Sequence, residues 1–467
     1  MDRSTGNTYN VSKEQIASGC ARRRFRAYPE YKNSGVEWLD QIPSHWNVKR
    51  LKYIASINDE VLAETTDPQY EMTYVDIGGV DQYQGIVNRE KYVFETAPSR
   101  ARRKVREGDV IISTVRTYLR AIAQIEAPES DLIVSTGFAV IRPGPIFSSH
   151  YAAYALRASY FIEKIVANSV GVSYPAIDAS KISRFPVAFP ELTKQESIAD
   201  FLDRETAKID ALIAKKERLI ELLQEKRTAL ITQAVTKGLD PNVSMKDSGI
   251  EWLGKIPAHW ECLALSRVTF ARCDGPFGSG LRSEHYSESG LRVVRLQNIG
   301  SAEFCDADRA YINEEYGSQL GDHSVLPGDL LIAGLGDEAH PVGRACVAPE
   351  HIVPAMVKAD CFRFRLDGRL LLARFAGYQL SATAAAAAGA LSTGATRSRL
   401  NLTAMATRKV ALPPLSEQAA IVSFLDRGCD ENYALIAKIQ VAIDRLHEYR
   451  TALISAAVTG KIDVRKA

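Results

Sequence analysis

Residues that would cross-link a fold or hold a metal ion are scarce in this chain. Seven cysteines are spread through 467 residues, their number is odd, and no two have the Cys-x-x-Cys spacing. This pattern argues against a disulfide framework and against a structural zinc site, and it fits a reducing, cytoplasmic location. The eight histidines form no His-Glu-x-x-His motif. We therefore expect no metal site.

Long apolar runs and an excess of one charge are also missing. No stretch of eighteen apolar residues occurs, so no membrane span is expected. The first residues lack the apolar core of a secretory signal, and residues 1–31 are predicted to be a polar leader. With 58 basic and 56 acidic residues the net charge is +2, whereas a lone DNA-binding domain is usually more basic. Binding of nucleic acid would have to depend on local basic patches or on a partner.

Motifs of nucleotide and methyl-transfer chemistry are absent too. The chain has no Asp-Pro-Pro-Tyr or Asn-Pro-Pro-Tyr motif for amino-methyl transfer and no Gly-x-x-x-x-Gly-Lys-Ser/Thr phosphate loop. The glycine-rich residues 275–280 have no clear strand–loop–helix context and are interpreted as a flexible loop. No catalytic residue and no cofactor are therefore assigned to this chain.

What the sequence does contain is an internal repeat. The phrase SGVEWLDQIPSHW at residues 34–46 returns as SGIEWLGKIPAHW at residues 248–260, with nine of thirteen positions identical. Its four tryptophans, Trp38, Trp46, Trp252 and Trp260, are predicted to be buried anchors. Later segments also recur: residues 106–113 and 326–333 at an offset of 220, then residues 192–203 and 415–426 and residues 226–240 and 449–463 at 223. The pattern indicates two copies of one plan, in which a globular region is followed by a long helix.

The unchanged offset of 223 predicts two long helices packed along their length, because an insertion would cost paired helices their register. Residues 193–196 form a capping box, and Gly238 and Gly460 occupy positions suited to C-terminal caps. Antiparallel packing is the simplest arrangement, and it would place two heads at the ends of a rod of roughly 65 Å. Apolar residues spaced by sevens predict the coiled-coil seam, namely Leu202, Ile209, Leu212, Leu219, Leu223 and Leu230 in the first helix and Leu425, Leu435, Ile439, Leu446 and Leu453 in the second.

The two globular regions are predicted to be strand-rich with some helix, since short β-prone runs are broken by Gly and Pro. The predicted fold class is α+β, with two such regions separated by two long helices and related by a pseudo-two-fold repeat. The expected globular regions are residues 32–190 and 241–412, and the expected helical regions are residues 191–240 and 413–467. Outside the repeated segments the two globular regions differ in sequence, which indicates that they bind different targets.

Basic and amide side chains follow the predicted strands of both globular regions. Arginine pairs with guanine edges, amides pair with adenine edges, and lysine or arginine holds phosphates. Such clusters are usually solvated surface, but here they recur at matching places in both copies. The predicted DNA-binding residues are Arg116, Tyr118, Arg120, Ser173 and Tyr174 in the first region and Arg282, Gln297, Asn298, Arg397 and Arg399 in the second.

Taken together, these motifs resemble those of the specificity subunits of type I restriction–modification systems. The resemblance rests on SGxEWLxxIPxHW opening each half, on the Gly-Asp element before a strand, on LxxQxxIxxFLD at each helix start and on RTALIxxAVTxxxD at each helix end. It covers nearly the whole chain after about residue 34. One mild departure is Phe189-Pro190-Glu191, which stands where a double proline is usual before the first helix.

The resemblance implies two target-recognition domains, each reading one half of a split, asymmetric double-stranded DNA sequence. It further implies that the antiparallel coiled coil sets the unread spacer and docks two methyltransferase subunits. Restriction (translocase) subunits would complete the complex. S-adenosylmethionine, ATP and Mg²⁺ would be bound by these partners and not by this chain.

Two other functions are compatible with parts of the pattern. A coiled-coil scaffold could bridge two protein partners without touching DNA, and a random duplex library mixed with the partner would then enrich no sequence. A self-contained methyltransferase is disfavoured by the missing catalytic motif, and titration with S-adenosylmethionine would test it.

Overall fold

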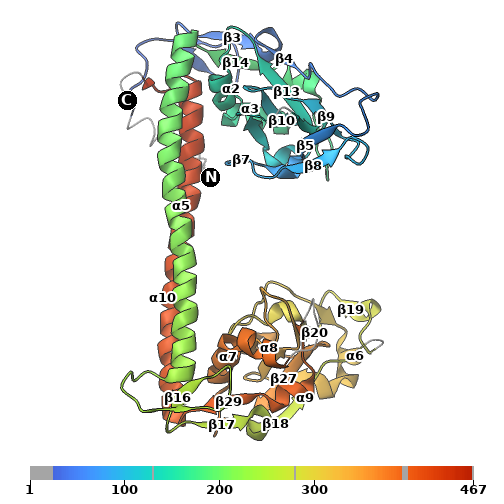
Figure 1. The fold of residues 1–467 in the computed structure, drawn as a ribbon, viewed down its shortest axis with the longest axis vertical. Coiled ribbons are helices and arrows are strands. Elements are labelled where there is room, and N and C mark those ends of the chain that lie inside the picture. The colour runs from blue at the N-terminus through green and yellow to red at the C-terminus, as the bar shows by residue number, and fades with distance from the viewer. Residues whose placement is uncertain (1–24, 129–130, 278–279, 392–397, 465–467) are drawn as a thin grey trace, which may run out of the picture. The chain divides into compact units, whose positions relative to one another are not determined.

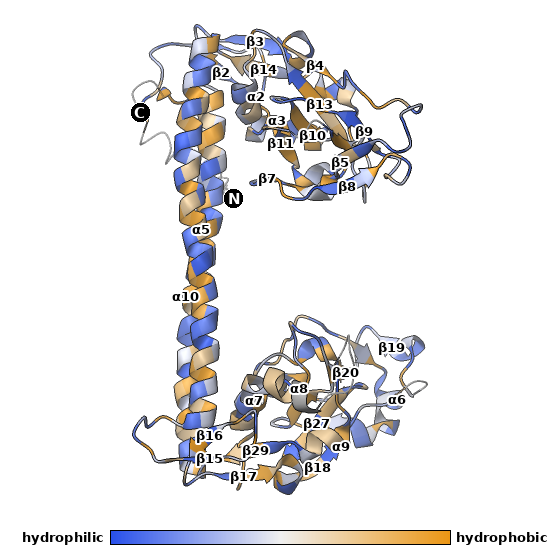
Figure 2. Cartoon of the chain, viewed as in Figure 1, coloured by the Kyte–Doolittle hydropathy of each residue, from blue (hydrophilic) through white to orange (hydrophobic). Residues whose placement is uncertain are grey.

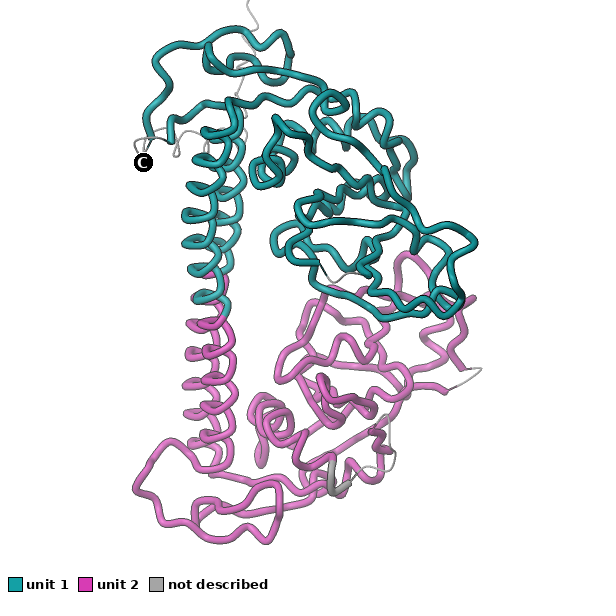
Figure 3. Tube along the Cα trace, turned by 45° about the horizontal axis from the view of Figure 1, so that its top comes forward, with its two compact units in different colours: residues 1–217, 440–467 teal, residues 218–439 magenta. Residues whose placement is uncertain are grey.

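The computed structural model describes residues 25–128, 131–277, 280–391 and 398–464 (Figure 1). It divides into two compact units, Met1–Glu217 with Gln440–Ala467 and Arg218–Ile439 (Figure 3). Each unit contains one strand-rich head and one segment of each long helix, α5 (Leu192–Lys237) and α10 (Leu415–Val458). No helix in the described ranges combines the length and the apolar character that crossing a bilayer requires.

Head one, residues 25–191, contains two four-stranded sheets. One has the order β11-β10-β13-β4 and is antiparallel, and the other has the order β8-β5-β12-β9, with β5 and β12 parallel. Three two-stranded pairs, β1-β2, β3-β14 and β6-β7, complete it. The strands are β1 (Tyr31–Asn33), β2 (Gln41–Pro43), β3 (Asn47–Arg50), β4 (Ala55–Ile57), β5 (Glu71–Val75), β6 (Val80–Asp81), β7 (Gly85–Ile86), β8 (Glu90–Val93), β9 (Ala101–Lys104), β10 (Val110–Ser113), β11 (Ile122–Gln124), β12 (Leu132–Ser135), β13 (Phe138–Pro143) and β14 (Pro186–Phe189), and the helices are α2 (Ser149–Ala155), α3 (Ser159–Ala167) and α4 (Ala179–Ile182).

Head two, residues 238–414, has a four-stranded sheet of order β18-β27-β23-β25 and a five-stranded sheet of order β19-β21-β20-β26-β22. Strands β20 and β26 are parallel, and β15-β16, β17-β29 and β24-β28 form two-stranded pairs. The strands are β15 (Met245–Asp247), β16 (Lys255–Pro257), β17 (Glu261–Ala264), β18 (Thr269–Cys273), β19 (Tyr286–Ser287), β20 (Leu291–Val294), β21 (Tyr311–Ile312), β22 (Ser324–Val325), β23 (Leu330–Ala333), β24 (Leu335–Gly336), β25 (Ala345–Val347), β26 (Ala355–Val357), β27 (Cys361–Leu366), β28 (Ser398–Arg399) and β29 (Lys409–Leu412), and the helices are α6 (Glu314–Gln319), α7 (Ala373–Ala382), α8 (Ala384–Leu391) and α9 (Leu402–Thr407).

The internal repeat extends to the topology of the heads, although their sequences differ. The order β11-β10-β13-β4 in head one matches β25-β23-β27-β18 in head two, and the parallel pair β5-β12 matches β20-β26. Figure 2 shows apolar residues gathered in the sheets of both heads. A buried strand needs apolar side chains rather than particular ones, so the topology persists while the sequence changes.

The aspartate of the repeated Gly-Asp element forms a bidentate ion pair with an arginine in each head, which we call the Gly-Asp fork. The buried Asp109 carboxylate accepts hydrogen bonds from Arg142 Nε (2.9 Å) and Nη2 (2.8 Å) and from the backbone N–H of Arg106 (2.8 Å). Asp329 accepts two bonds of 2.9 Å from Arg365 in the same way. The fork raises the pKa of the Arg142 guanidinium above its ordinary value, chiefly through the hydrogen bond to Asp109. These aspartates are therefore counter-ions inside each head.

The repeated phrase packs against the C-terminal caps of the long helices. Trp46 and Trp260 are fully buried. Gly460, after α10, has a φ of 71°, and a Cβ there would lie 2.3 Å from Pro43 and 3.5 Å from Trp46. Gly238, after α5, has a φ of 75°, and its Cβ would lie 3.4 Å from Trp260. Only glycine meets both the left-handed backbone and the close approach, which explains the cap glycine and the tryptophan in both copies.

The other two tryptophans of the phrase are not buried anchors of this kind. Trp38 is 36% exposed, with Lys164 Nζ lying 3.9 Å from its ring centroid. Trp252 is half-buried and packs at the edge of the core of unit 2. The prediction of four buried anchors is therefore confirmed for Trp46 and Trp260 and wrong for Trp38.

The seam between the long helices follows one of the two predicted rows. Leu212, Leu219 and Leu435 are 44%, 43% and 44% exposed, so their placement in the seam is wrong. The second row of α5 lies one residue further on, which rotates each side chain by about 100° around the helix. The inward-facing row that the sequence predicted consists of Leu202, Ile209, Leu223 and Leu230 on α5 and Leu425, Ile439, Leu446 and Leu453 on α10, and the second row of α5 consists of Thr206, Ile213, Ile220, Arg227 and Ala234.

One arginine of the repeated RTALI motif crosses the helix pair in each unit. In unit 1, Arg450 Nε on α10 lies 3.0 Å from Asp210 Oδ1 on α5. In unit 2, the Arg227 guanidinium on α5 lies 4.8 Å from the ring centroid of Tyr433 on α10. Because Arg227 and Arg450 are 223 residues apart, as are Asp210 and Tyr433, the two contacts are equivalent positions of the repeat.

The helix segments are antiparallel within unit 2. Asn432 Nδ2 donates to Leu223 O (3.1 Å), and Glu417, earlier on α10, lies beside Gly238 at the far end of α5. Figures 1 and 3 show the segments lying side by side in each unit. A polar side chain in an otherwise apolar seam is a common means of fixing register.

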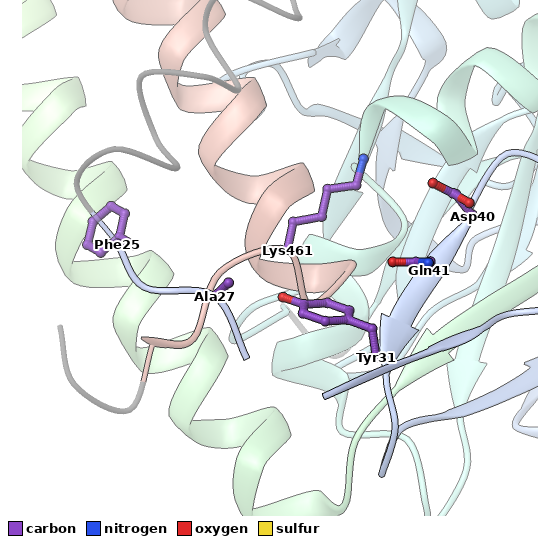
Figure 4. Close-up of a pocket in the computed structure, with 6 residues that line it drawn as sticks. All are labelled: Phe25, Ala27, Tyr31, Asp40, Gln41 and Lys461. Carbon is purple, nitrogen blue, oxygen red and sulfur yellow. The ribbon is translucent and has the colours of Figure 1, made fainter. Parts of the chain in front are cut away.

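Part of the expected polar leader is packed. Residues 1–24 lie outside the described residues, but Tyr28 is buried, and Phe25 meets Phe201 of α5 edge-on at 5.3 Å. The Tyr31 hydroxyl donates to Gly460 O (3.0 Å). A shallow hollow of about 330 Å³ lies at this junction, lined by Phe25, Ala27, Tyr31, Asp40, Gln41 and Lys461 (Figure 4). Residues 25–31 are therefore part of the packed structure of unit 1, because their aromatic side chains find apolar partners.

Neighbouring residues of α5 allow a direct test of the corrected seam. Ile213→Ala should lower the free energy of unfolding by roughly 2–4 kcal/mol, whereas Leu212→Ala should change it by about 0.5 kcal/mol or less. Guanidinium unfolding followed by circular dichroism measures both. A larger loss for Leu212→Ala than for Ile213→Ala would contradict the seam.

Candidate nucleic-acid interface

Five of the predicted DNA-binding residues lie on two adjoining loops of head one. Residues 114–121 connect β10 to β11, and residues 168–178 connect α3 to α4; we refer to these segments as the paired loops. The hydroxyls of Thr117 and Ser169 are 2.8 Å apart, and Val115 and Ala176 form an antiparallel bridge. Arg116, Tyr118, Arg120, Ser173 and Tyr174 are all exposed on this pair.

The backbone of the first loop is held in an uncommon conformation. Arg116 and Arg120 have φ values of 52° and 51°, and they flank a single 3-10 turn, Thr117–Leu119. Left-handed backbone costs a side-chain-bearing residue on the order of 1–3 kcal/mol and persists where the surroundings enforce it. Here Thr117 is buried and Thr114 Oγ1 donates to Gly137 O (2.8 Å), so the fold holds the strained turn in place.

The paired loops combine cations and aromatic rings, and their one acid, Asp178 at the end of the second loop, forms no ion pair among the described residues. The Arg116 guanidinium lies 5.1 Å from the ring centroid of Tyr174. Within the described parts of the chain, neither Arg116 nor Arg120 has a carboxylate ion-pair partner. Tyr118 and Tyr174 are 54% and 65% exposed. Free guanidinium donors beside exposed rings suit a polyanion with stacked bases, since they can bind phosphates and base edges.

The predicted residues of head two do not form such a cluster. Asn298 is fully buried, and its Nδ2 donates to Cys305 O and Asp308 O (both 2.8 Å). The structure therefore contradicts a base-reading role for Asn298, because its amide is used inside the head. Arg397 lies outside the described residues.

The remaining residues of this set are exposed but dispersed. Arg399 donates to Asp360 Oδ1 (2.9 Å from Nε), so its charge is already paired. Arg282 lies 3.6 Å from Glu284, and Gln297 is exposed in a 3-10 turn, Leu296–Asn298. No contact among the described residues joins Arg282, Gln297 and Arg399.

Head two carries a counterpart of the paired loops with different charges. The pairing of β24 with β28 aligns Leu335 with Arg399, at the positions of Val115 and Ala176 in head one. The connection that follows β24 contains Asp337, Glu338 and His340 and no free arginine, since Arg344 is buried. The two heads thus present different side chains on one scaffold.

Each head is attached to its long helix by the same buried glutamine. Gln195 Oε1 accepts from Ser148 N (2.8 Å), while its Nε2 donates to Ile146 O and Pro190 O (3.0 and 2.9 Å). Gln418 makes the equivalent three bonds to Leu372, Leu370 and Pro413 at 2.8, 2.9 and 2.9 Å. This is the Gln of the LxxQ motif, and both amides are fully buried and fully bonded.

Beside this glutamine the two attachments differ by one residue type. In head two, Arg374 and the Tyr378 hydroxyl both bond Asp426 Oδ1 (3.0 and 2.6 Å). In head one, Tyr154 bonds Asp203, 223 residues before Asp426, and His150 takes the place of the arginine.

The His150 imidazole lies between carboxylates of α5. Its Nε2 is 2.6 Å from Asp203 Oδ2, its Nδ1 is 3.3 Å from Glu196 Oε2, and Asp200 is 4.0 Å away. Burial lowers the pKa of His150, but the hydrogen bonds and charges of Asp203 and Glu196 outweigh it and leave the pKa raised. His150, Asp200 and Asp203 are also close enough to share a metal ion. Both ring nitrogens already meet carboxylates, however, and an arginine serves in head two, so we interpret the group as a charge pair.

Some exposed side chains of the paired loops escaped prediction from the sequence. Leu119, Val170 and Val172 are 40%, 72% and 101% exposed. The only signal in the sequence was a pair of valines around Gly171 in a segment without charge, and apolar residues in a short segment are ordinarily assigned to a core.

Comparison with known proteins identifies the architecture. The sequence pattern of the family described as type I restriction modification DNA specificity domain matches residues 43–222 and 322–445, which is over half of the chain. The chain belongs to this family. It therefore serves in recognition of DNA sequence within type I restriction–modification, and nothing in the comparisons favours a scaffold that never meets DNA.

Individual relatives agree with this assignment. The StySPI specificity subunit of a type I restriction enzyme from Salmonella potsdam is 23% identical over 331 residues, covering 69% of this chain and 67% of its own length. The EcoKI specificity subunit from Escherichia coli K12 is 21% identical over 337 residues, covering 69% and 68%. A solved structure concerned with complex assembly and conformational transition of the type I R-M system has 24% identity and a TM-score of 0.61, covering 89% of this chain and 98% of its own. At that identity the likeness shows the fold.

The His150 contact should make the stability of this specificity protein depend on pH. The raised pKa means that the charged imidazole contributes stability fully below its ordinary pKa of about 6.5, and that this contribution is lost as pH rises through the raised value. Relative to His150→Arg, the wild-type Tm should fall by about 2–4 °C across this window. Thermal unfolding from acid to alkaline pH measures the difference.

The equivalent residue of head two supplies a matched control for the pH effect. Arg374→His should introduce a weaker pH dependence of the same sign into unit 2, since Asp426 and Tyr378 match Asp203 and Tyr154 but Ala419 stands where head one has Glu196. If the Tm of His150→Arg changed with pH as the wild-type Tm does, the imidazole charge would not contribute to the pH dependence of stability.

The free arginines of the paired loops should contribute to binding of duplex DNA. Replacing Arg116 and Arg120 by alanine should lower affinity and reduce the slope of log K against log salt by about 0.9 for each phosphate that is no longer neutralised. Titration of a labelled duplex at several salt concentrations measures both. Arg106→Ala is the matched control, because that exposed arginine is already paired with Glu60. Equal effects of the control and the double variant would refute the assignment.

Proposed function

We propose that this chain is the DNA-reading subunit of a type I restriction–modification complex, in which each head reads one half of a split, asymmetric sequence. The observation that supports this most directly is the pair of heads with one topology and different reading loops. Free arginines occupy the connection after β10 in head one, whereas two acids and a histidine occupy the matching connection in head two. Two different sets of side chains on one scaffold suit two different half-sites.

The long helices would set the number of unread base pairs between the half-sites. Their offset of 223 is unchanged from residue 192 to residue 240, and the register is fixed by polar contacts such as Arg450–Asp210. Paired helices of fixed register keep a constant length. The length of the spacer would then be determined by the helices, and the sequence of each half-site would be determined by one head.

The exposed leucines of the long helices are the proposed docking surface for two methyltransferase subunits. Leu212 in unit 1 and Leu435 in unit 2 are both 44% exposed and are 223 residues apart, so each unit presents one leucine at an equivalent position. Exposed apolar side chains at repeated positions suit two copies of one partner. This assigns Leu212 and Leu435 to partner contact instead of to the seam.

The chemistry would belong to the partners. We infer that S-adenosylmethionine is bound by the methyltransferase subunits, that ATP and Mg²⁺ are bound by the restriction subunits, and that this chain has no catalytic residue and acts in the cytoplasm. The support is the missing methyl-transfer and phosphate-loop motifs of the sequence.

Selection from a random duplex library tests the reading function. The chain assembled with its methyltransferase subunits should enrich one asymmetric sequence in two blocks separated by an unread spacer of fixed length. Replacing Arg116 and Arg120 by alanine should erode the information in one block only. Enrichment of no sequence would overturn the proposal, as would one continuous site or equal erosion of both blocks.

A further inference from the structure

We infer that the tip of the second paired loop, residues 171–174, reads a thymine in the half-site of head one through apolar contact of Val172 with the C5-methyl group. The inference rests on the proposed function, because it assumes that head one reads DNA. It adds to that function the protein side chain and the base group that make one contact.

The loop is anchored firmly at its base. Val170 N donates to Ala176 O (2.8 Å), and Ala176 N donates to Val170 O (3.0 Å), so residues 171–175 form a closed turn. Ile177 N donates to Thr114 O (2.8 Å), which ties the turn to the end of β10. The tip is therefore presented by a fixed support.

Gly171 fixes the direction of the tip. Its φ is 114°, and a Cβ at this position would lie 3.2 Å from Tyr174 O. Both the left-handed backbone and the close approach require glycine. The next residue, Val172, is 101% exposed and makes no use of its apolar side chain within the head. A fixed turn that holds a valine entirely in water leaves this side chain available to a partner, and its burial there would be favourable.

The surroundings of the tip indicate the kind of partner. Residues 168–176 contain no acidic side chain, and Asp178 lies beyond the anchored base of the turn. The neighbouring cation is Arg116, which lies over the Tyr174 ring and has no carboxylate partner in the described chain. An apolar tip beside an unpaired guanidinium complements a surface that carries negative charge next to an apolar group. The DNA major groove fits this description, because phosphates line its edges and thymine presents a methyl group inside it.

The other side chains of the tip are suited to different tasks. The Tyr174 ring lies under Arg116, so it positions that guanidinium, and the exposed Ser173 hydroxyl can donate to or accept from a neighbouring base or phosphate. Val172 is the fully exposed aliphatic side chain of residues 171–175, whereas the Pro175 ring is half-buried. It is therefore the side chain assigned to the methyl group.

Deoxyuridine substitution tests the contact atom by atom, since uracil differs from thymine only by the missing methyl group. Each thymine of the head-one half-site is replaced in turn, and the affinity of the assembled complex is measured by competition. Wild type should lose about three- to five-fold at one position, as expected for one buried methyl group. Val172→Ala should bind the thymine duplex more weakly and should bind thymine and uracil equally at that position.

Two controls separate the possible causes. Val170→Ala lies at the base of the same turn and should keep the thymine preference, and an unchanged Tm should show that Val172→Ala is folded. The inference is overturned if no thymine position is sensitive, if the half-site contains no thymine, or if Val172→Ala keeps the preference. It is also overturned if Val172→Ala weakens assembly with the methyltransferase subunits and leaves the preference intact, since the tip would then contact protein. Failure to select any head-one half-site would instead refute the proposed function.

Discussion

Two long helices that share an interface cannot gain or lose a residue without moving the contacts beyond it, and the other features of this chain depend on that constraint. It explains why the offset of the repeat grows by nine between residues 34 and 192, where the heads lie, and stays at 223 along the helices. It also explains the polar residues of the seam. Arg450 meets Asp210 and Asn432 meets Leu223 O, and an apolar seam alone would allow slippage by a turn.

The same constraint divides the heads into shared supports and variable surfaces. Residues that attach a head to a helix are repeated in kind. Gln195 and Gln418 make equivalent sets of three hydrogen bonds, and Trp46 and Trp260 each cover the cap glycine of one long helix. Where a head meets only solvent in the described structure, the two copies diverge in charge. Specificity for two sequences can then change by substitution in the loops, while the packing that holds the heads stays the same.

Prediction from the sequence succeeded where a periodic or repeated pattern determines the structure. The two helices, the inward row through Leu202 and Leu425 and the strand-rich heads follow from spacing and capping signals. The second seam row failed, because leucines at 212 and 219 repeat by seven as well as the true row does, and periodicity alone cannot show which row faces the partner helix. The similar topology of the heads was hidden, since different apolar residues build equivalent strands.

The candidate site divides in the same way. Arg116 and Tyr174 could be selected as candidates because one follows the repeated Gly-Asp strand and the other precedes the first long helix, but their contact and the fate of an individual polar side chain could not be anticipated. Asn298 carries the amide that suits adenine, yet three backbone groups of its own head occupy it. Exposure of Val172 depends on a turn conformation that only the folded chain displays.

The modest net charge of +2 also has a structural explanation. Many arginines of this chain are internal: Arg142 and Arg365 hold the Gly-Asp forks, and Arg408 is fully buried, with hydrogen bonds to Gly343 O, Leu380 O and Thr383 and its pKa lowered to about 9 by burial. Such residues add to the formal charge without offering it to a polyanion. Only arginines that are exposed and lack an acidic partner can bind phosphates, and Arg116 and Arg120 of the paired loops are two such arginines of head one. An arginine committed to an internal contact therefore holds the fold together and adds nothing to the attraction between the protein and DNA phosphates.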